Sequence, residues 1–178
     1  RYEPGSTFKA LVLAAALEEG LVSESDHFYC SGSAQLADHT IHCSRRQGHL
    51  DQDLAKAVGN SCNPAFMEIG KRLGKDKFYE YFEAFGLMEN TGIDLPGEAS
   101  LKGAIWAKEK MGEVELATAS FGQRFDVTPL QMICAFSAVI NGGNLVKPYV
   151  VQSISTGDGA VIQNTETETV RQVISAET

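Results

Sequence analysis

A serine and a lysine three residues apart could form a nucleophile and its base. Ser6 and Lys9 follow a Pro-Gly dipeptide, which is typical of turns, and precede an almost wholly apolar stretch over residues 10–17. Alanine and leucine favour a helix, and residues three apart share one helix face, so we expect the amine to reach the hydroxyl. A helix that is apolar all round is buried, and burial lowers the pKa of a lysine. A neutral amine beside a hydroxyl is a base beside a nucleophile.

A second serine motif, Ser61-Cys62-Asn63, follows further along the chain. Ser-x-x-Lys and a later Ser-x-Asn-type motif occur in this order in serine enzymes that react with penicillin. Each motif alone has an ordinary structural alternative. The first could be a helix cap with a surface lysine, and Ser61 and Asn63 could cap a helix that begins near Pro64. The ordered pair favours catalysis.

Several ordered stretches resemble the transpeptidase domain of class B penicillin-binding proteins, the peptidoglycan D,D-transpeptidases. They are residues 2–9 (YEPGSTFK), 60–66 (NSCNPAF), 92–98 (GIDLPGE), and 117–123 (ATASFGQ) with 127–131 (VTPLQ). The resemblance extends from residue 1 to about residue 151. Within the family, the chain resembles the sporulation and septation type of Gram-positive bacteria more than it resembles a β-lactamase.

The resemblance implies acyl transfer and a role for each motif residue. Ser6 would attack the carbonyl of the penultimate D-Ala in a D-Ala-D-Ala stem peptide of peptidoglycan, with Lys9 as its general base. Ser61 would relay a proton to the leaving amine, and Asn63 would hold Lys9 and the substrate amide. A β-lactam antibiotic would mimic the substrate and stay on Ser6 as an ester. No cofactor and no metal ion is implied.

The resemblance also implies an α+β fold, of which this chain would hold one part. Residues 1–144 would form a mostly helical lobe, and residues 145–178 the start of the central sheet, with a C-terminal β-hairpin and the sheet incomplete. The chain lacks Lys-Thr-Gly and Lys-Ser-Gly and does not begin with Met. We therefore expect a larger parent protein, anchored at the extracytoplasmic face of the bacterial membrane by a segment outside this chain, with other cell-wall synthesis proteins as partners.

The chain departs from the family pattern at three further positions. Arg124 follows Gly-Gln where the family usually has glycine, and Leu50 follows His49 where glycine is common. Ala10 replaces a frequent proline. We expect these departures to change only the local backbone geometry.

Two other functions remain open. A β-lactamase or D,D-carboxypeptidase would need a base that activates water at the acyl-enzyme, and Glu89 and Glu98 are the nearest candidates. A non-catalytic β-lactam-binding or scaffold module would lack Lys-Thr-Gly in its full length. By itself, the chain should react slowly with penicillin, because the family's second oxyanion donor lies just past that motif. We also expect it to self-associate through open strand edges and exposed apolar surface.

Composition limits the possible partners. The formal net charge of −8 argues against nucleic acid as a ligand. Four cysteines allow three full pairings, among which the sequence does not choose. Cys30 and Cys43 bracket a polar segment, so our hypothesis is a disulfide between them under oxidising conditions, with Cys62 left free. Cys134 lies in an apolar helical pattern and should be a buried small hydrophobe.

Zinc is a weaker alternative for the histidines and cysteines. Their spacing is irregular, and adjacent His42 and Cys43 make poor joint ligands for one ion. The candidate ligands are His27, His39, His42 and His49, with Cys30 and Cys43.

The apolar patterns predict helices at 6–19, 51–58, 65–73, 75–85, 114–120 and 129–140. Strands are expected at 27–29, 40–42, 149–155 and 160–163, the last two joined by an Asp-Gly hairpin turn. The aromatic residues at 78, 79, 81 and 82 should belong to the core.

Overall fold

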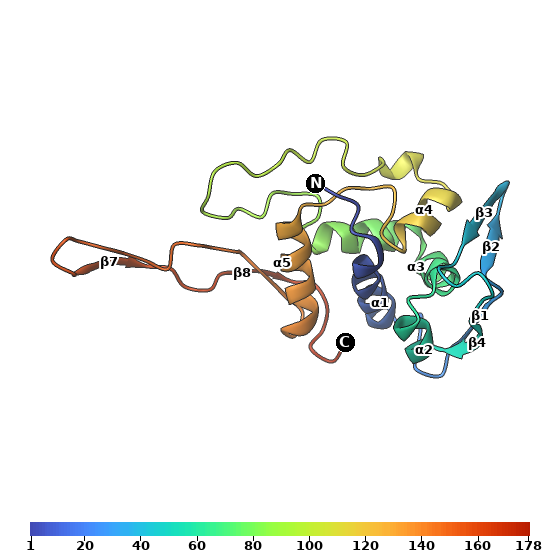
Figure 1. Ribbon diagram of the computed structural model, residues 1–178. Helices are drawn as coiled ribbons and strands as arrows, with labels where there is room; N and C mark the ends of the chain where they lie inside the picture. Colours follow the sequence, from blue (N-terminus) through green and yellow to red (C-terminus); the bar gives the residue numbers. More distant parts are fainter.

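Helix α1 (Lys9–Glu18) lies amid the other helices in the computed structural model, which describes residues 1–178 (Figure 1). A short 3-10 helix, η1 (Gly5–Phe8), leads directly into it. Because α1 is apolar on nearly every side, it is buried between α3 (Asn63–Ala84) and α5 (Pro129–Ile140). The helix predicted over 6–19 is therefore confirmed, with its first turn in 3-10 geometry.

Helix α3 is bent where the sequence predicts a break between two helices. Gly74 has a φ of 74°, outside the helical range, and this interrupts the helix between residues 73 and 75. Pro64 lies in the first turn, where its missing N–H costs no hydrogen bond. Upstream of the bend, Gly70 contacts Ser120, just after α4 (Glu113–Ala119), so closely that a Cβ on Gly70 would overlap the serine side chain.

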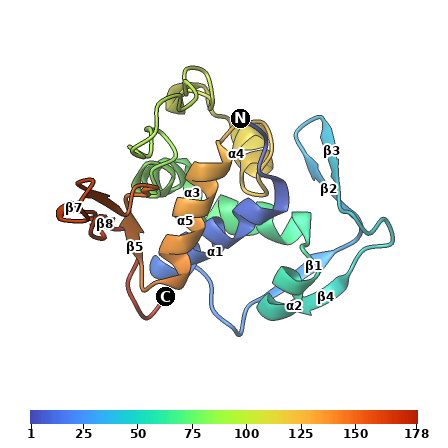
Figure 2. The same ribbon diagram turned by 60° about the vertical axis from the view of Figure 1, so that its left-hand side comes forward.

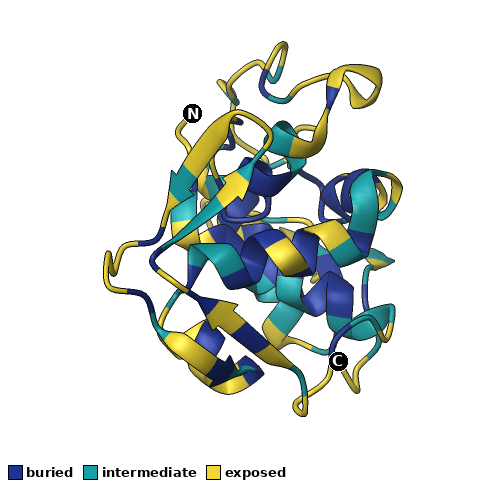
Figure 3. Ribbon diagram, turned by 90° about the vertical axis from the view of Figure 1, so that its right-hand side faces the viewer, coloured by how far each residue is buried: buried dark blue, intermediate teal, exposed yellow.

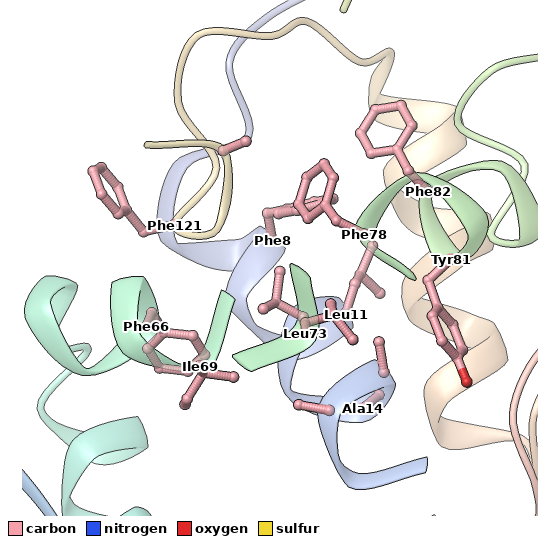
Figure 4. Packing of buried hydrophobic residues seen from close by; sticks show 14 of the residues in the cluster. Phe8, Leu11, Ala14, Phe66, Ile69, Leu73, Phe78, Tyr81, Phe82 and Phe121 are labelled. Carbon is pink, nitrogen blue, oxygen red and sulfur yellow. The ribbon is translucent and has the colours of Figure 1, made fainter. Parts of the chain in front are cut away.

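The core on one side of α1 is aromatic. The Phe8 ring packs against Phe78, Phe82 and Phe125, with centroids 4.8–6.0 Å apart. Figure 4 shows Phe8 beside Phe78, with leucines of α1 and α3 below them. The predicted core aromatics at 78, 79, 81 and 82 are all buried, which confirms their role. Figure 3 shows that the central helices are largely buried and that the outer loops are exposed.

Four short strands and α2 (Leu54–Gly59) form one end of the molecule. β1 (His27–Cys30) pairs with β4 (Leu50–Asp53), and β2 (Ser33–Leu36) pairs with β3 (His39–His42), both antiparallel. The helix predicted from residue 51 is wrong in its first turn. Residues 50–53 are extended instead, and the Asp53 side chain caps α2 by accepting the Lys56 N–H at 2.8 Å.

The remaining strands lie at the opposite end of the helices (Figures 1 and 2). β5 (Asn144–Val146) pairs with β8 (Thr169–Gln172), and β6 (Ser153–Ser155) pairs with β7 (Val161–Asn164) in a projecting hairpin. β6 is shorter than the predicted strand, because the N–H groups of Val150 and Val151 donate to Asp94, each at 2.8 Å. A second 3-10 turn, η2 (Lys108–Lys110), precedes α4.

The fold is α+β, as expected from the sequence. Its helices form one continuous core, and each strand pair is antiparallel and two-stranded. None of the helices is both long and apolar enough to cross a bilayer.

Candidate active site

Lys9 joins the two serine motifs. It is the first residue of α1, is only 4% exposed, and its Nζ lies 3.3 Å from Ser6 Oγ. The same nitrogen donates to the Ser61 carbonyl at 2.7 Å, to Ser61 Oγ at 3.0 Å and to Asn63 Oδ1 at 2.8 Å. The structure thus brings all four predicted site residues together, although more than fifty positions separate the motifs in the chain.

The surroundings of Lys9 favour its neutral form. Burial lowers its pKa to about 8, against an opposing effect of the nearby Cys43 and Cys62 thiols. Its Nζ lies 5.3 Å from the centre of the Phe66 ring, which covers one side of the amine. Sequence reasoning did not single out Phe66, although it lies three residues after Asn63 and so on the same side of α3. A lysine with this pKa is partly deprotonated near neutral pH and can act as a base.

Ser6 is held in place by a close contact between two glycines. Gly5 has a φ of 58°, and its N–H donates to the Gly122 carbonyl at 2.8 Å. Gly122 has a φ of 82°, and a Cβ there would overlap the Gly5 backbone. Thr7 Oγ1 donates to the Pro4 carbonyl at 2.8 Å and fixes the turn from the other side. The segment around Gly122 is thus a support for the Ser6 turn.

Ser61 occupies a strained turn between α2 and α3. Its φ is 49°, a left-handed value that costs energy for any residue with a Cβ. The turn is tied down because the Cys62 N–H donates to the Ala57 carbonyl at 3.0 Å, and Asn63 Nδ2 donates to the His42 carbonyl at 3.2 Å. This conformation directs both the carbonyl and the hydroxyl of Ser61 toward Lys9.

An open hollow of about 430 Å³ lies beside Ser6 and Lys9. Its walls come mainly from α1, with single residues of α2 and α3 and two of α5, and are mostly apolar; Ser61 also lines it. A peptide or a small cyclic amide could reach the Ser6 hydroxyl from this side. The apolar side chains of the wall are Ala10, Leu13, Ala14, Leu17, Val58, Phe66, Phe136 and Val139.

Both carboxylates considered as water-activating bases are engaged elsewhere. Glu98 accepts the N–H and hydroxyl of Thr91 and the N–H of Gly92, at 2.8–3.0 Å. Glu89 forms an ion pair with Arg171. Neither glutamate lines the hollow beside Ser6.

The predicted disulfide is absent from the structure. Cys30 and Cys43 are free thiols, as are Cys62 and Cys134, and all four are buried. Cys134 is packed in the core as expected. Cys62 is free as expected, and it lies close to Cys30, Cys43 and His49.

Comparison with known proteins identifies the same family along the whole chain. The model for the penicillin binding protein transpeptidase domain matches residues 1–178. Stage V sporulation protein D of Bacillus subtilis is 45% identical over 99% of this chain, and penicillin-binding protein PbpB of Mycolicibacterium smegmatis is 31% identical over 99%. The chain spans only 27% of the length of either relative.

Solved structures have the same fold. The D,D-transpeptidase domain of a peptidoglycan glycosyltransferase from Eggerthella lenta superposes with a TM-score of 0.87 at 26% identity, over 99% of this chain and 45% of its own. Penicillin binding protein 3 of Mycobacterium tuberculosis, solved in complex with aztreonam, gives 0.87 at 28% identity, over 99% of this chain and 39% of its own.

Proposed function

The chain belongs to the transpeptidase domain family of penicillin-binding proteins, and from this premise we propose that it carries the acylation centre of a peptidoglycan D,D-transpeptidase. The observation that carries the proposal is the buried Lys9 amine, within hydrogen-bond distance of Ser6, Ser61 and Asn63. A base that contacts both a nucleophile and a second hydroxyl can take a proton from one and return it through the other.

In the proposed first step, neutral Lys9 accepts the proton of the Ser6 hydroxyl while Ser6 Oγ attacks the carbonyl carbon of the penultimate D-Ala. The tetrahedral intermediate collapses when the C–N bond to the terminal D-Ala breaks. Lys9 and Ser61, whose Nζ and Oγ are 3.0 Å apart, return the proton to the leaving nitrogen. Free D-Ala departs, and the rest of the stem peptide remains as an ester on Ser6.

In the second step, an amine of another stem peptide attacks this ester. The C–O bond to Ser6 breaks as the new amide bond cross-links the two peptides. The amine's proton passes to Lys9, which returns it to Ser6 Oγ. Asn63 is suited to hold the substrate amide. Hydrogen bonds to Lys9 and to the His42 carbonyl fix its side chain beside the site, and each end of the amide can form one more hydrogen bond.

β-Lactams fit the same chemistry. Attack of Ser6 on a β-lactam carbonyl breaks the ring amide, but the ring nitrogen stays attached to the acyl group and blocks the second step. The β-lactam complex of the related mycobacterial protein supports this reading. The occupied Glu98 argues against a hydrolase, which needs a free base beside the ester.

Membership of this family also suggests how the chain divides into a lobe and part of a sheet, and where the parent protein works. Residues 1–144 would serve as the helical lobe, and residues 145–178, which hold β5–β8, as the start of the central sheet. The parent protein would work on the extracytoplasmic face of the bacterial membrane, anchored outside this chain, among other cell-wall synthesis proteins. The names of the relatives support this location, since one is a sporulation protein and others are peptidoglycan D,D-transpeptidases.

Labelling of the full-length protein with a fluorescent penicillin tests the proposal. Wild-type protein should retain the label through denaturing electrophoresis, and Ser6→Ala should retain none, because it has no hydroxyl to acylate. Thr7→Ala is the matched control. It removes the neighbouring hydroxyl, which is bonded to Pro4, and should still be labelled. Wild-type labelling of Ser6→Ala would refute the proposed nucleophile.

A further inference from the structure

Four metal-ligating side chains from separate parts of the chain meet beside the Ser61–Asn63 turn. The sulfur atoms of three buried cysteines and a ring nitrogen of a half-buried histidine all lie within 4.8 Å of one another. We propose that Cys30, Cys43, His49 and Cys62 together bind one Zn²⁺ ion that fixes this turn. The proposal concerns metal binding and does not depend on the reaction proposed above.

The separations suit a tetrahedral ion. Zinc–sulfur bonds of about 2.3 Å and zinc–nitrogen bonds of about 2.0 Å place neighbouring ligand atoms roughly 3.5–3.8 Å apart. Cys43 Sγ lies 3.7 Å from His49 Nδ1, within this range. The other pairs lie no more than 4.8 Å apart, so none has to close by more than roughly 1.3 Å. Four protein ligands with no open position are typical of a structural zinc site.

The backbone holds the ligands together by close packing of two loops. Gly32 and Gly48 have φ values of 100° and 81°, which favour glycine. A Cβ on Gly32 would overlap the Arg46 carbonyl, and a Cβ on Gly48 would overlap the Cys30 carbonyl. The Cys43 N–H also donates to the Gly32 carbonyl at 2.9 Å. The loop over 43–49 is therefore pressed against the end of β1, where Cys30 lies.

A buried hydrogen-bond donor beside the Cys62 sulfur has no partner. Gln52 is 2% exposed, and its Nε2 has no hydrogen-bond partner, although its side chain lies against the Cys62 sulfur. A metal-bound thiolate accepts such hydrogen bonds far better than a neutral thiol does. The unpaired amide of Gln52 thus points to a charged sulfur beside it.

Coordination uses the whole cluster, whereas a disulfide would use only two of its members. Three thiols can form one disulfide, which leaves the third cysteine and His49 without a role. Zinc binding uses all four and needs no oxidant, because the three thiol protons pass to water and the imidazole donates a lone pair. The ion would connect Cys62 to β1 and to the 43–49 loop. Cys62 lies between Ser61 and Asn63, so the strained turn would be fixed by the metal.

Metal analysis of the full-length protein tests this proposal. After purification under reducing conditions and equilibration with Zn²⁺, wild-type protein should hold one zinc ion per chain. Replacement by Co²⁺ should give the visible absorption of a tetrahedral thiolate site. Cys30→Ser and His49→Ala should lose the ion, while His49→Cys should keep it with a spectrum shifted toward four thiolates.

Two matched controls separate the site from general effects. Cys134→Ser removes a buried cysteine outside the cluster, and His39→Ala removes an exposed histidine in β3; both should retain one zinc ion. The proposal would be overturned by wild-type protein with far less than one zinc per chain, or by full zinc content in both Cys30→Ser and His49→Ala. Loss of the ion from His49→Cys, or a disulfide between two of the three cysteines in zinc-equilibrated protein, would also overturn it.

Discussion

Lys9 can act as a base only while it carries no proton. Burial lowers its pKa, while the neighbouring thiols raise it, and the result is about 8. We therefore predict that acylation of Ser6 by a fluorescent penicillin rises with pH and levels off above about pH 8. Below that pH the neutral fraction of the lysine falls about tenfold per unit, and the rate should follow it.

Lys9→Arg is the control for this pH profile, because arginine keeps the charge but does not lose its proton. The acylation rate of Lys9→Arg should be lower than that of the wild type by about a hundredfold or more. It should also not rise near pH 8. Stopped-flow or gel-based labelling rates from pH 6 to pH 9 provide the measurement. A flat wild-type profile, or near-normal acylation by Lys9→Arg, would contradict the role of the amine.

Two departures from the family pattern occupy left-handed backbone positions. Leu50 has a φ of 58° and Arg124 a φ of 67°, at the two positions where the resemblance to the family leads us to expect glycine. Because a left-handed conformation costs a non-glycine residue about 1–2 kcal/mol, Leu50→Gly and Arg124→Gly should each stabilise the fold, net of chain entropy, by about 1 kcal/mol. Chemical denaturation measures this difference.

A glycine at an ordinary backbone position should have the opposite effect. Ala55→Gly, on the exposed face of α2, should destabilise the protein by about 0.5–1 kcal/mol. Arg124 also has its N–H bonded to Glu3 Oε1 at 2.9 Å, a contact that glycine retains. A lower free energy of unfolding in both Leu50→Gly and Arg124→Gly would contradict the argument that these two residues are strained.

At the scale of the elements, α3 and the end of α4 can pack closely because position 70 is a glycine and has no side chain. Gly70→Ala would place a methyl group into the side chain of buried Ser120. Overpacking of this kind costs about 1–3 kcal/mol, so thermal unfolding should occur at a clearly lower temperature. Ser120→Gly in the same chain should restore part of the loss, because it removes both overlapping atoms.

A double-mutant cycle in denaturant measures the coupling between these two positions. Ser120→Gly alone should be mildly destabilising, since it removes the hydrogen bond to the Leu116 carbonyl. Purely additive effects of Gly70→Ala and Ser120→Gly would mean that the two elements do not meet as described.

Helices with strong local signals could be predicted from the sequence. Pro129–Ile140 was predicted to the residue from an apolar pattern that Gly142 and Gly143 stop, and the structure adds a capping box of Thr128 and Gln131 at its start. The break near Gly74 was also predicted. β4 was missed because residues 50–53 are mainly polar and are extended only through pairing with β1, more than twenty positions earlier. The shortening of β6 depends on Asp94, more than fifty positions away, which no local pattern reveals.

The candidate site was predictable where motifs carry the chemistry. Ser6, Lys9, Ser61 and Asn63 were named from two short motifs, and the structure places them in contact. Of the cysteine cluster, Cys30, Cys43 and His49 were among the candidate zinc ligands, but Cys62 was not, because it belongs to a turn that sequence spacing does not relate to Cys30.

At the scale of the whole molecule, the β6–β7 hairpin is an exposed projection with apolar side chains. It projects from the helices, is two-stranded, and exposes Ile154, Val161 and Ile162 (Figure 1). Unpaired strand edges with apolar side chains favour association between chains. We predict that residues 1–178 form dimers or larger species as concentration rises, and that Ile162→Lys reduces this association.

Leu95→Lys is the matched control, because Leu95 is an exposed aliphatic residue in a bend outside the strands. It should associate as the wild type does. Sedimentation velocity over a range of concentrations gives the result. Wild-type chain that stays monomeric at high concentration, or equal effects of the two lysine substitutions, would refute the role of the hairpin.

The contact between Gly5 and Gly122 limits how the protein can evolve under selection by a covalent inhibitor. A side chain at position 122 would overlap the Gly5 backbone, so changes there would displace the turn that holds Ser6, the proposed nucleophile. Escape variants should therefore arise on the wall of the hollow, at residues such as Val58, Phe136 and Val139, where side chains can change size without moving Ser6. An inhibitor that gains its affinity from the glycine-supported turn would leave the organism fewer routes to resistance than one that relies on that wall.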